Sequence, residues 1–240
     1  MTSLSVVIPA YNEEKRLPAT LDRVTAWLDA QSLEFGEVIV VDDGSRDGTA
    51  ALVERYCAAH PCVRLLQNPG NRGKGYSVRY GILETRGEWV LFSDADLSTP
   101  IEDVTRLYEA ASDAGADIAI GSRALDRSLV SKRQAPLREL SGRFFNLVMR
   151  TATGLPFRDT QCGFKLYRAS AAREVFSRQK LDGFSFDVEA LYIARRLGIP
   201  AVEAPVRWAN VEGTKVSALT GLRSFADLVR IRRTQSGRDK

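Results

Sequence analysis

Apolar residues along the chain follow two alternating periods, and this alternation predicts a β-sheet covered by helices. Short runs rich in β-branched residues predict six strands, at 4–10, 37–42, 62–67, 88–94, 117–122 and 201–207. Between the first two runs, apolar residues from Leu17 to Leu28 repeat on one helical stripe. Strands that alternate with helices are typical of a mostly parallel sheet, so we expect an α/β fold in a single domain spanning residues 1–218.

The remaining elements are predicted from local signals. A capping box, which marks the start of a helix, is formed by Thr99, Pro100 and Glu102. The stretch 123–136 has no clean period and many polar residues, which predicts a mobile surface loop. Helices are expected at about 137–152 and 184–197, with a Gly- and Asp-rich turn between them.

Composition narrows the chemistry. With 44% hydrophobic and 27% charged residues, the 240-residue chain has the balance of a globular protein, which excludes disordered and collagen-like classes. The three cysteines, Cys57, Cys62 and Cys162, are odd in number and show no CxxC spacing, which argues against a disulfide framework or a zinc site. His60 is the only histidine, so a Ser-His-Asp triad and a Cys-His pair are excluded. The chemistry must therefore use carboxylates, cationic side chains, amides or a hard metal.

Positive charge is concentrated at the C-terminal end. The net charge is +4 overall, whereas residues 207–240 alone carry +5. Residues 219–233 form a basic amphipathic pattern that predicts a helix in the headgroup layer of an anionic membrane, the alternative being a helix packed on the domain. We treat 219–240 as a C-terminal helix and tail. No secretory signal or membrane-spanning run is recognisable, so we expect a cytoplasmic protein, peripheral on the cytoplasmic face of a membrane.

Polar residues follow the predicted strands, at the edge where open α/β sheets bind ligands. Asp94 and Asp96 come directly after the fourth run, where two carboxylates can converge on Mg²⁺ or Mn²⁺ and leave positions for phosphate oxygens. Aspartates after a strand are also common turn formers. Asp42 and Asp43 end the second run, where a buried acidic pair needs a hydroxyl, an amide or a cation.

The GNRGKG stretch at 70–75 puts Arg72 and Lys74 among glycines at an expected helix start, which suits an anion. It lacks the GxxxxGK[ST] spacing of a Walker A loop. A basic surface turn is the alternative explanation.

Four motifs occur in the order of a known family. SVVIPAYNEE, VVDDGSRDGT, GNRGKGYSVRYGI and FSDADLSTP together resemble the family 2 inverting glycosyltransferases of the GT-A fold. RDTQCGFKLY, FSFDVEALYIA and WANVEGTKVS are similar to the dolichyl-phosphate glucosyltransferase branch. The resemblance implies a twisted, Rossmann-like GT-A sheet, a nucleotide-sugar donor and a lipid-phosphate acceptor.

The resemblance also assigns residues. The donor nucleotide sugar would be bound by Pro9, Ala10, Tyr11, Glu13, Asp42, Lys74, Ser93, Asp94, Ala95, Asp96, Gln161 and Lys215. The acceptor phosphate would be received by Arg123, Arg138 and Arg207, and the metal by Asp94 and Asp96. Asp159 and Asp187 would line the sugar and, with Asp96, act in catalysis. Acidic residues that favour a helix N-terminus are the alternative reading of the group around Asp187.

The expected reaction is transfer of glucose from UDP-glucose to a polyprenyl or dolichyl phosphate. Because a phosphate monoester is already an anion at pH 7, with a second pKa of about 6, no general base is required. GDP-mannose is the alternative donor, and a sugar-phosphate nucleotidyltransferase is the alternative reaction class. The glycine-rich loop that a sugar-phosphate nucleotidyltransferase has after its first strand is missing from this sequence. A dehydrogenase would need a GxGxxG motif after a strand, which is missing as well. We expect no nucleic-acid partner.

Overall fold

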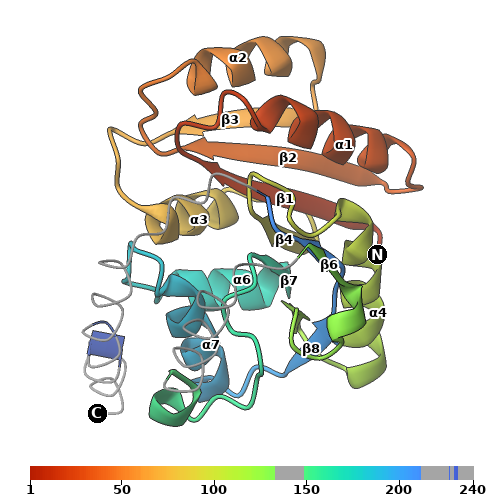
Figure 1. Cartoon of the computed structure of the whole chain (residues 1–240), viewed down its shortest axis with the longest axis vertical. Helices are drawn as coiled ribbons and strands as arrows, with labels where there is room; N and C mark the ends of the chain where they lie inside the picture. The colour runs from red at the N-terminus through yellow and green to blue at the C-terminus, as the bar shows by residue number, and fades with distance from the viewer. Residues whose placement is uncertain (133–148, 212–226, 228–229, 232–240) are drawn as a thin grey trace.

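A seven-stranded sheet forms the centre of the computed structural model, which describes residues 1–132, 149–211, 227 and 230–231. Figure 1 shows the sheet with helices on both sides, in the strand order β3-β2-β1-β4-β7-β5-β8. The strands are β1 (Ser3–Ala10), β2 (Phe35–Asp42), β3 (Val63–Gln67), β4 (Trp89–Ser93), β5 (Ile118–Ser122), β7 (Phe164–Arg168) and β8 (Ala201–Pro205). All pairs are parallel except the two made by β7. All six predicted strands are confirmed, and so is the α/β fold class.

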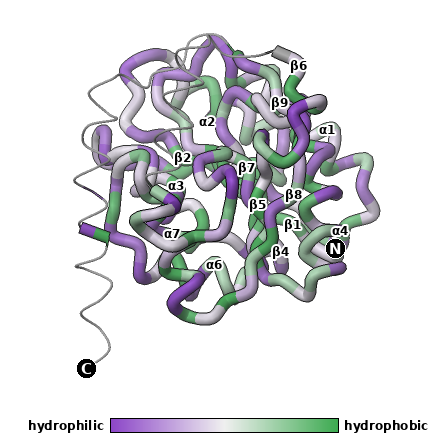
Figure 2. The backbone as a smooth tube through the Cα atoms, turned by 60° about the horizontal axis from the view of Figure 1, so that its bottom comes forward, coloured by the Kyte–Doolittle hydropathy of each residue, from purple (hydrophilic) through white to green (hydrophobic). Residues whose placement is uncertain are grey.

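Each face of the sheet has its own layer of helices because successive strand residues point to opposite sides. On one face, Val7 and Phe92 pack in a core with α3 (Lys74–Leu83), α6 (Ala169–Phe176) and α7 (Phe186–Arg196). On the other face, Ile8 and Leu91 pack with α1 (Leu17–Asp29), α2 (Thr49–Ala59) and α4 (Val104–Ala114). Figure 2 shows hydrophobic residues concentrated in the central strands. The predicted stripe from Leu17 to Leu28 is the buried side of α1.

The antiparallel strand β7 was not predicted. It lies between β4 and β5, with Phe92 opposite Lys165 and Ile120 also opposite Lys165. We expected a Gly- and Asp-rich turn in this region, where the structure has the strand FKLYR. Lys165 is nevertheless fully buried, and this is possible because a carboxylate from α7 meets its ammonium.

The predicted capping box at 99–102 is wrong. The chain there forms a 3₁₀ turn (η1, Ile101–Asp103) that leads into α4, and no side chain caps it. Pro100 is extended, with φ −61° and ψ 142°, so it precedes the turn and does not occupy its first position. Thr99 is buried, and Glu102 faces the guanidinium groups of two arginines instead of reaching back to the Thr99 amide.

The expected surface loop at 123–136 is partly regular. A second 3₁₀ turn (η2, Arg127–Leu129) leads into β6 (Val130–Lys132), which pairs in parallel with β9 (Trp208–Ala209). Residues 133–136 lie outside the described part. The helix predicted at 184–197 is α7, and of the one predicted at 137–152 the structure describes residues 149–153 as helical.

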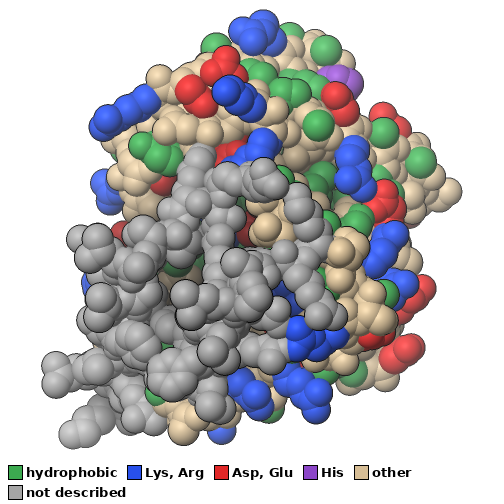
Figure 3. Space-filling model, in the orientation of Figure 1, with side chains coloured by type: hydrophobic (Ala, Val, Ile, Leu, Met, Phe, Trp, Pro, Cys, Tyr) green, Lys and Arg blue, Asp and Glu red, His purple; other side chains and the backbone are tan. Residues whose placement is uncertain are grey.

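Most of the predicted C-terminal helix, 219–233, lies outside the described residues. Asp227, Arg230 and Ile231 are helical, and Ile231 is buried in the core on the α6 and α7 side of the sheet. Figure 3 shows acidic and basic side chains interspersed over the described surface on that view's face of the molecule.

Candidate active site

The site forms where the parallel strands β1, β2, β4 and β5 end, because parallel strands bring their carboxyl ends to one edge of the sheet. The antiparallel strand β7 starts at the same edge, so the preceding segment 159–163 enters the site as well. Two helices, α3 and α7, also begin next to these strand ends.

Asp94 and Asp96 stand in a tight turn at the end of β4. The backbone N–H of Leu97 donates to the carbonyl oxygen of Asp94 at 3.2 Å, and Leu97 has a positive φ of 44°. One carboxylate oxygen of Asp96 accepts from the Ser98 amide at 3.0 Å. Thr20 donates to the carbonyl of Ala95 between them, which fixes the turn to α1. Both carboxylates remain partly exposed, so they are open to a ligand.

Lys74, the first residue of α3, reaches the same carboxylate pair. Its Nζ lies 2.7 Å from Oδ1 of Asp94, with 21% of the lysine side chain and 36% of the aspartate side chain exposed. Burial works against the ammonium, but Asp94 and then Asp187 outweigh it and raise the pKa of Lys74 above its ordinary value. The predicted helix start at the GNRGKG stretch is confirmed, and its lysine faces the DxD aspartate.

Asp187, in the first turn of α7, is almost fully buried and is bound by Lys165 of β7. The Lys165 ammonium also donates to the carbonyl of Cys162 at 2.6 Å. Burial raises the pKa of Asp187, and the positive charges of Lys165 and Lys74 only partly offset this. The buried ion pair therefore joins α7, β7 and the segment before β7. Asp187 is thus engaged with Lys165, and its role in catalysis stays a prediction.

Arg123 and Asp159 form the second buried ion pair of the site. Arg123 Nε donates to Oδ2 of Asp159 at 2.6 Å, and Nη2 donates to Oδ1 at 2.9 Å. Burial opposes ionisation of Asp159, but Arg123 holds the pKa of this carboxyl below its ordinary value. The guanidinium also stacks on the ring of Trp208, 5.5 Å from the centroid. Asp159 therefore orients an arginine.

Arg207 binds a structural carboxylate. Its Nε donates to Oδ1 of buried Asp103 at 2.7 Å, and its backbone N–H donates to Oδ2 at 2.6 Å. Nearly half of its side chain, 46%, is exposed. The structure thus ties the segment after β8 to the start of α4 through this residue.

The two aspartates at the end of β2, Asp42 and Asp43, accept hydrogen bonds from different groups. Asp43 accepts from the backbone amides of Arg72 and Gly73 and from the side chain of Asn68, so it shapes the GNRGKG loop. Asp42 accepts from the Ser45 amide through Oδ2, whereas its buried Oδ1 has no hydrogen-bond partner among the residues that the structure describes. A buried acceptor without a donor is costly, so this oxygen is suited to a donor group supplied by a ligand.

The segment after β1 lies beside the loop after β2. The amide of Asn12, which has a positive φ of 53°, donates to Ser45 Oγ at 2.9 Å, and the amide of Glu13 donates to Thr49. The Glu13 carboxylate is bound by Arg16. Pro9 and Ala10 are the last residues of β1, and Tyr11 follows them, half-buried.

The other predicted residues have these positions. Ser93 ends β4 and is buried, and Gln161 lies half-buried in the segment before β7. Arg138 and Lys215 lie outside the described residues. Burial raises the pKa of Cys162 to about 12, so its thiol stays protonated at neutral pH and offers no nucleophile.

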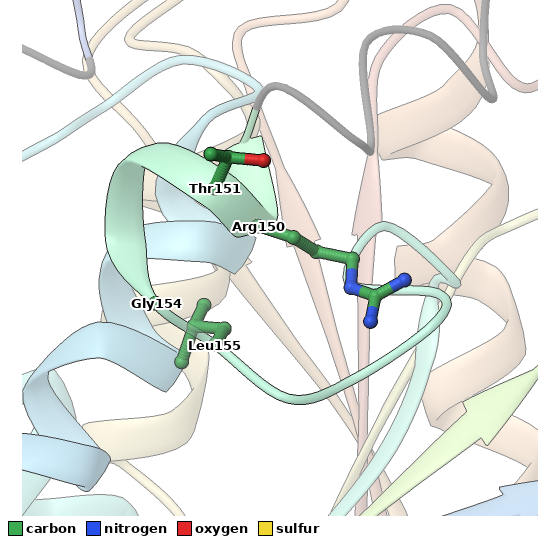
Figure 4. Close-up of a pocket in the computed structure, with 4 residues that line it drawn as sticks. All are labelled: Arg150, Thr151, Gly154 and Leu155. Carbon is green, nitrogen blue, oxygen red and sulfur yellow. The ribbon is translucent and has the colours of Figure 1, made fainter.

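A cavity of about 290 Å³ lies elsewhere, lined by Arg150, Thr151, Gly154 and Leu155 (Figure 4). None of the predicted site residues that the structure describes lines it. The Arg150 side chain extends away from its helix, and its buried Nε has no hydrogen-bond partner within the described part of the chain.

Sequence reasoning placed Lys165 with Asp159 and Gln161 beside the sugar, but it missed the burial of Lys165 against Asp187 and the role of Gly163. A charged residue at a core-facing position of an alternating run, such as Lys165 in FKLYR, is a signal for a buried ion pair. Gly163 lies so close to the Asp94 carboxylate that any Cβ there would overlap it. The residue types around Gly163 in the sequence do not indicate this contact.

The fold and the site together are those of an α/β protein with a candidate ligand site at the carboxyl edge of a mostly parallel sheet. The profile of Glycosyl transferase family 2 matches residues 5–176, and the chain belongs to this family. It is a glycosyltransferase with a GT-A-like fold.

Three curated relatives that match most of this chain are dolichyl-phosphate beta-glucosyltransferases. The dolichyl-phosphate beta-glucosyltransferase of Dictyostelium discoideum is 40% identical, over 95% of this chain and 73% of the relative. That of Homo sapiens is 40% identical, over 89% of this chain and 69% of the relative. That of Saccharomyces cerevisiae is 35% identical, over 95% of this chain and 74% of the relative.

Solved structures share the fold at low identity. Mannosyl-3-phosphoglycerate synthase from Rubrobacter xylanophilus aligns with a TM-score of 0.71 and 18% identity, over 99% of this chain and 75% of that one. Glucosyl-3-phosphoglycerate synthase from Mycobacterium tuberculosis, solved with UDP, aligns with a TM-score of 0.67 and 21% identity, over 96% and 80%. Among the described residues, no helix combines the length and the hydrophobicity needed to span a bilayer.

Proposed function

We propose that the chain transfers glucose from UDP-glucose to a dolichyl or other polyprenyl phosphate, with inversion at the sugar C1. The relatives at 35–42% identity carry the name dolichyl-phosphate beta-glucosyltransferase. The single observation that carries the proposal is the end of β4, where Asp94 and Asp96 lie partly exposed with the Lys74 ammonium 2.7 Å from the first of them. Carboxylates and an ammonium at one sheet edge are suited to a metal-bound diphosphate.

The donor set at this turn fits Mg²⁺ or Mn²⁺. Asp94 and Asp96 offer hard carboxylate oxygens, and among the described residues no group of three or more potential ligands forms a closed cage. Two carboxylates leave positions for diphosphate oxygens. When bound, such an ion supplies positive charge that stabilises the departing diphosphate. Lys74 adds a second positive charge beside it.

The nucleoside is assigned to the ends of β1 and β2. Within the described chain the buried Oδ1 of Asp42 has no donor, and an imide N–H of uracil or a ribose hydroxyl would supply one. Tyr11 lies half-buried at the same edge and offers a ring for stacking on the base. Pro9, Ala10 and Glu13 shape the segment that holds this ring.

The acceptor phosphate is assigned to Arg123, oriented by Asp159, together with Arg138 and Arg207. A phosphate oxygen attacks C1, the bond from C1 to the nucleoside diphosphate breaks, and its electron pair stays on the β-phosphate oxygen. The acceptor is already an anion, so no proton is moved. Asp159 and Asp187, the two carboxylates that could act as a base, are each engaged in an ion pair. This supports a scheme in which no base is needed.

The sugar hydroxyls would be bound by Gln161 and by other atoms of the segment 159–163. Lys215 would add positive charge from the C-terminal side. The basic side chains of segment 219–233 would hold the enzyme on the cytoplasmic face of an anionic membrane, where the lipid acceptor is, while Ile231 of this segment packs in the domain core. Co-sedimentation with liposomes tests this part: binding should require anionic lipid, and equal binding to neutral liposomes contradicts it.

The reaction is tested with purified protein, MgCl₂, a polyprenyl phosphate, and either UDP-glucose or GDP-mannose. We expect a charged glycolipid from UDP-glucose. Glycolipid formed only from GDP-mannose reassigns the donor. Nucleotide release without glycolipid from either donor refutes the proposal.

A further inference from the structure

Lys74 binds one of the two carboxylates that we assign to the divalent cation. Its Nζ is 2.7 Å from Oδ1 of Asp94, the first of the two aspartates that we assign to the divalent ion. The Asp94 carboxylate is further confined by Gly163, which contacts it and whose carbonyl accepts from the Asp94 amide at 3.0 Å. In the donor-free protein, this carboxylate therefore already has a positively charged partner.

The charge of a second carboxylate, that of Asp187, also acts on the Lys74 ammonium. Lys74 Nζ lies 5.2 Å from the centre of the Phe92 ring, and Lys165 Nζ lies 5.9 Å from the centre of that ring. Lys165 binds Asp187, so Phe92 sits among two ammonium groups and the buried carboxylate of Asp187. Asp187 acts on Lys74 electrostatically, next after Asp94. Lys74 is thus held in the site by more than one negative charge.

We propose that Lys74 is the resident counter-ion of Asp94 in the donor-free enzyme, and that it leaves Asp94 for the donor diphosphate when a divalent cation binds. The proposal rests on the proposed function, because it needs a diphosphate donor and a cation at Asp94 and Asp96. Lys74 then has two opposing effects: it competes with the cation alone, and it strengthens binding of the nucleotide together with the cation.

The exchange follows from charge balance. A carboxylate neutralised by an ammonium attracts a divalent ion less strongly, so the cation has to displace Lys74 or share Asp94 with it. A nucleoside diphosphate brings negative charge that accepts the displaced ammonium. Lys165 holds the Asp187 carboxylate in place. The negative charge of Asp187 attracts the Lys74 ammonium, so the ammonium stays close to the expected diphosphate position after it leaves Asp94. Cation and nucleotide should therefore bind together far better than either binds alone.

The test measures MnCl₂ binding without nucleotide, by electron paramagnetic resonance, in the wild type and in Lys74→Met. We expect Lys74→Met to bind Mn²⁺ about tenfold more tightly, the scale of one partly buried ion pair. In saturating MnCl₂, we expect the same variant to bind UDP about tenfold more weakly, by calorimetry. A merely structural role for Lys74 would move both affinities in the same direction.

Arg72→Met is the matched control, because the Arg72 side chain carries the same charge on the same loop but its guanidinium lies over the Tyr76 ring, and the backbone amide that binds Asp43 is kept in the variant. It should leave the affinity for Mn²⁺ unchanged. Unchanged or weaker Mn²⁺ binding by Lys74→Met overturns the proposal, as does equal tightening by Arg72→Met. Lack of any Mn²⁺-dependent UDP binding in the wild type instead refutes the proposed function itself.

Discussion

Asp94 and Gly163 are in contact twice: the Asp94 amide donates to the Gly163 carbonyl at 3.0 Å, and the Asp94 carboxylate lies against the Gly163 Cα. Gly163→Ala would place a methyl group on that carboxylate. We expect the Asp94 side chain to be displaced and the transferase rate to fall about 100-fold or more. Glycolipid formation measures the loss, and circular dichroism verifies the fold.

Gly183→Ala is the control for that substitution. A Cβ at Gly183 meets no atom within 4 Å, so the transferase rate should be retained. A Gly163→Ala enzyme with wild-type rate would show that the position of Asp94 is not critical.

Asp96→Ala should abolish metal-dependent donor binding while leaving the fold intact. From the described residues the Asp96 side chain accepts one hydrogen bond, from the Ser98 amide, so we expect little stability to depend on it. Calorimetric titration with UDP in the presence and absence of MnCl₂ measures the effect. Asp126→Ala is matched to it, because Asp126 accepts the Ser128 amide in the same way on an exposed turn. Unchanged UDP titration in Asp96→Ala contradicts the metal-binding role.

Asp159→Asn should destabilise the protein by about 2–3 kcal/mol, because it leaves the Arg123 guanidinium without its counter-ion. The figure is below that of a fully buried pair, since 32% of the Arg123 side chain is exposed. Urea denaturation at pH 7 measures it. Glu88→Gln, which removes one partner of the exposed Arg168, should cost less than about 0.5 kcal/mol. Equal costs for the two variants would contradict the role of burial.

The Asp159 contribution should also depend on pH. Arg123 depresses the pKa of this carboxyl below its unfolded value near 3.8, although burial acts against it. The stabilisation is therefore complete above that value and is lost as pH falls through the lower folded pKa. The difference in unfolding free energy between wild type and Asp159→Asn should shrink below about pH 4. A difference that stays constant down to pH 3 would refute the assignment.

The parallel part of the fold could be predicted from local pattern. Runs such as EVIVVD and EWVLFSD are apolar on both faces, which is the pattern of a strand buried between two helix layers. The same reasoning predicted that polar residues after the strands gather at one edge, and Asp42, Asp94 and Arg123 do lie at strand ends there.

Partnerships across the chain could not be predicted in this way. Lys165 is buried because Asp187, 22 residues later, meets it, and Arg123 is oriented by Asp159, 36 residues later. Such pairs depend on the order of strands in the sheet, and an antiparallel insertion gives no local signal. The capping box failed for a related reason: Glu102 faces Arg207, which comes from the far end of the domain.

The position of β7 has a consequence for how the protein is made. The sheet has β4 (Trp89–Ser93) and β5 (Ile118–Ser122) on either side of a strand that leaves the ribosome some 40 residues after the second of them. Until Phe164–Arg168 is synthesised, both neighbours expose unpaired hydrogen-bonding edges in the nascent chain. The central part of the sheet therefore cannot be completed until β7 has been synthesised. A truncation before β7 should yield an aggregation-prone fragment.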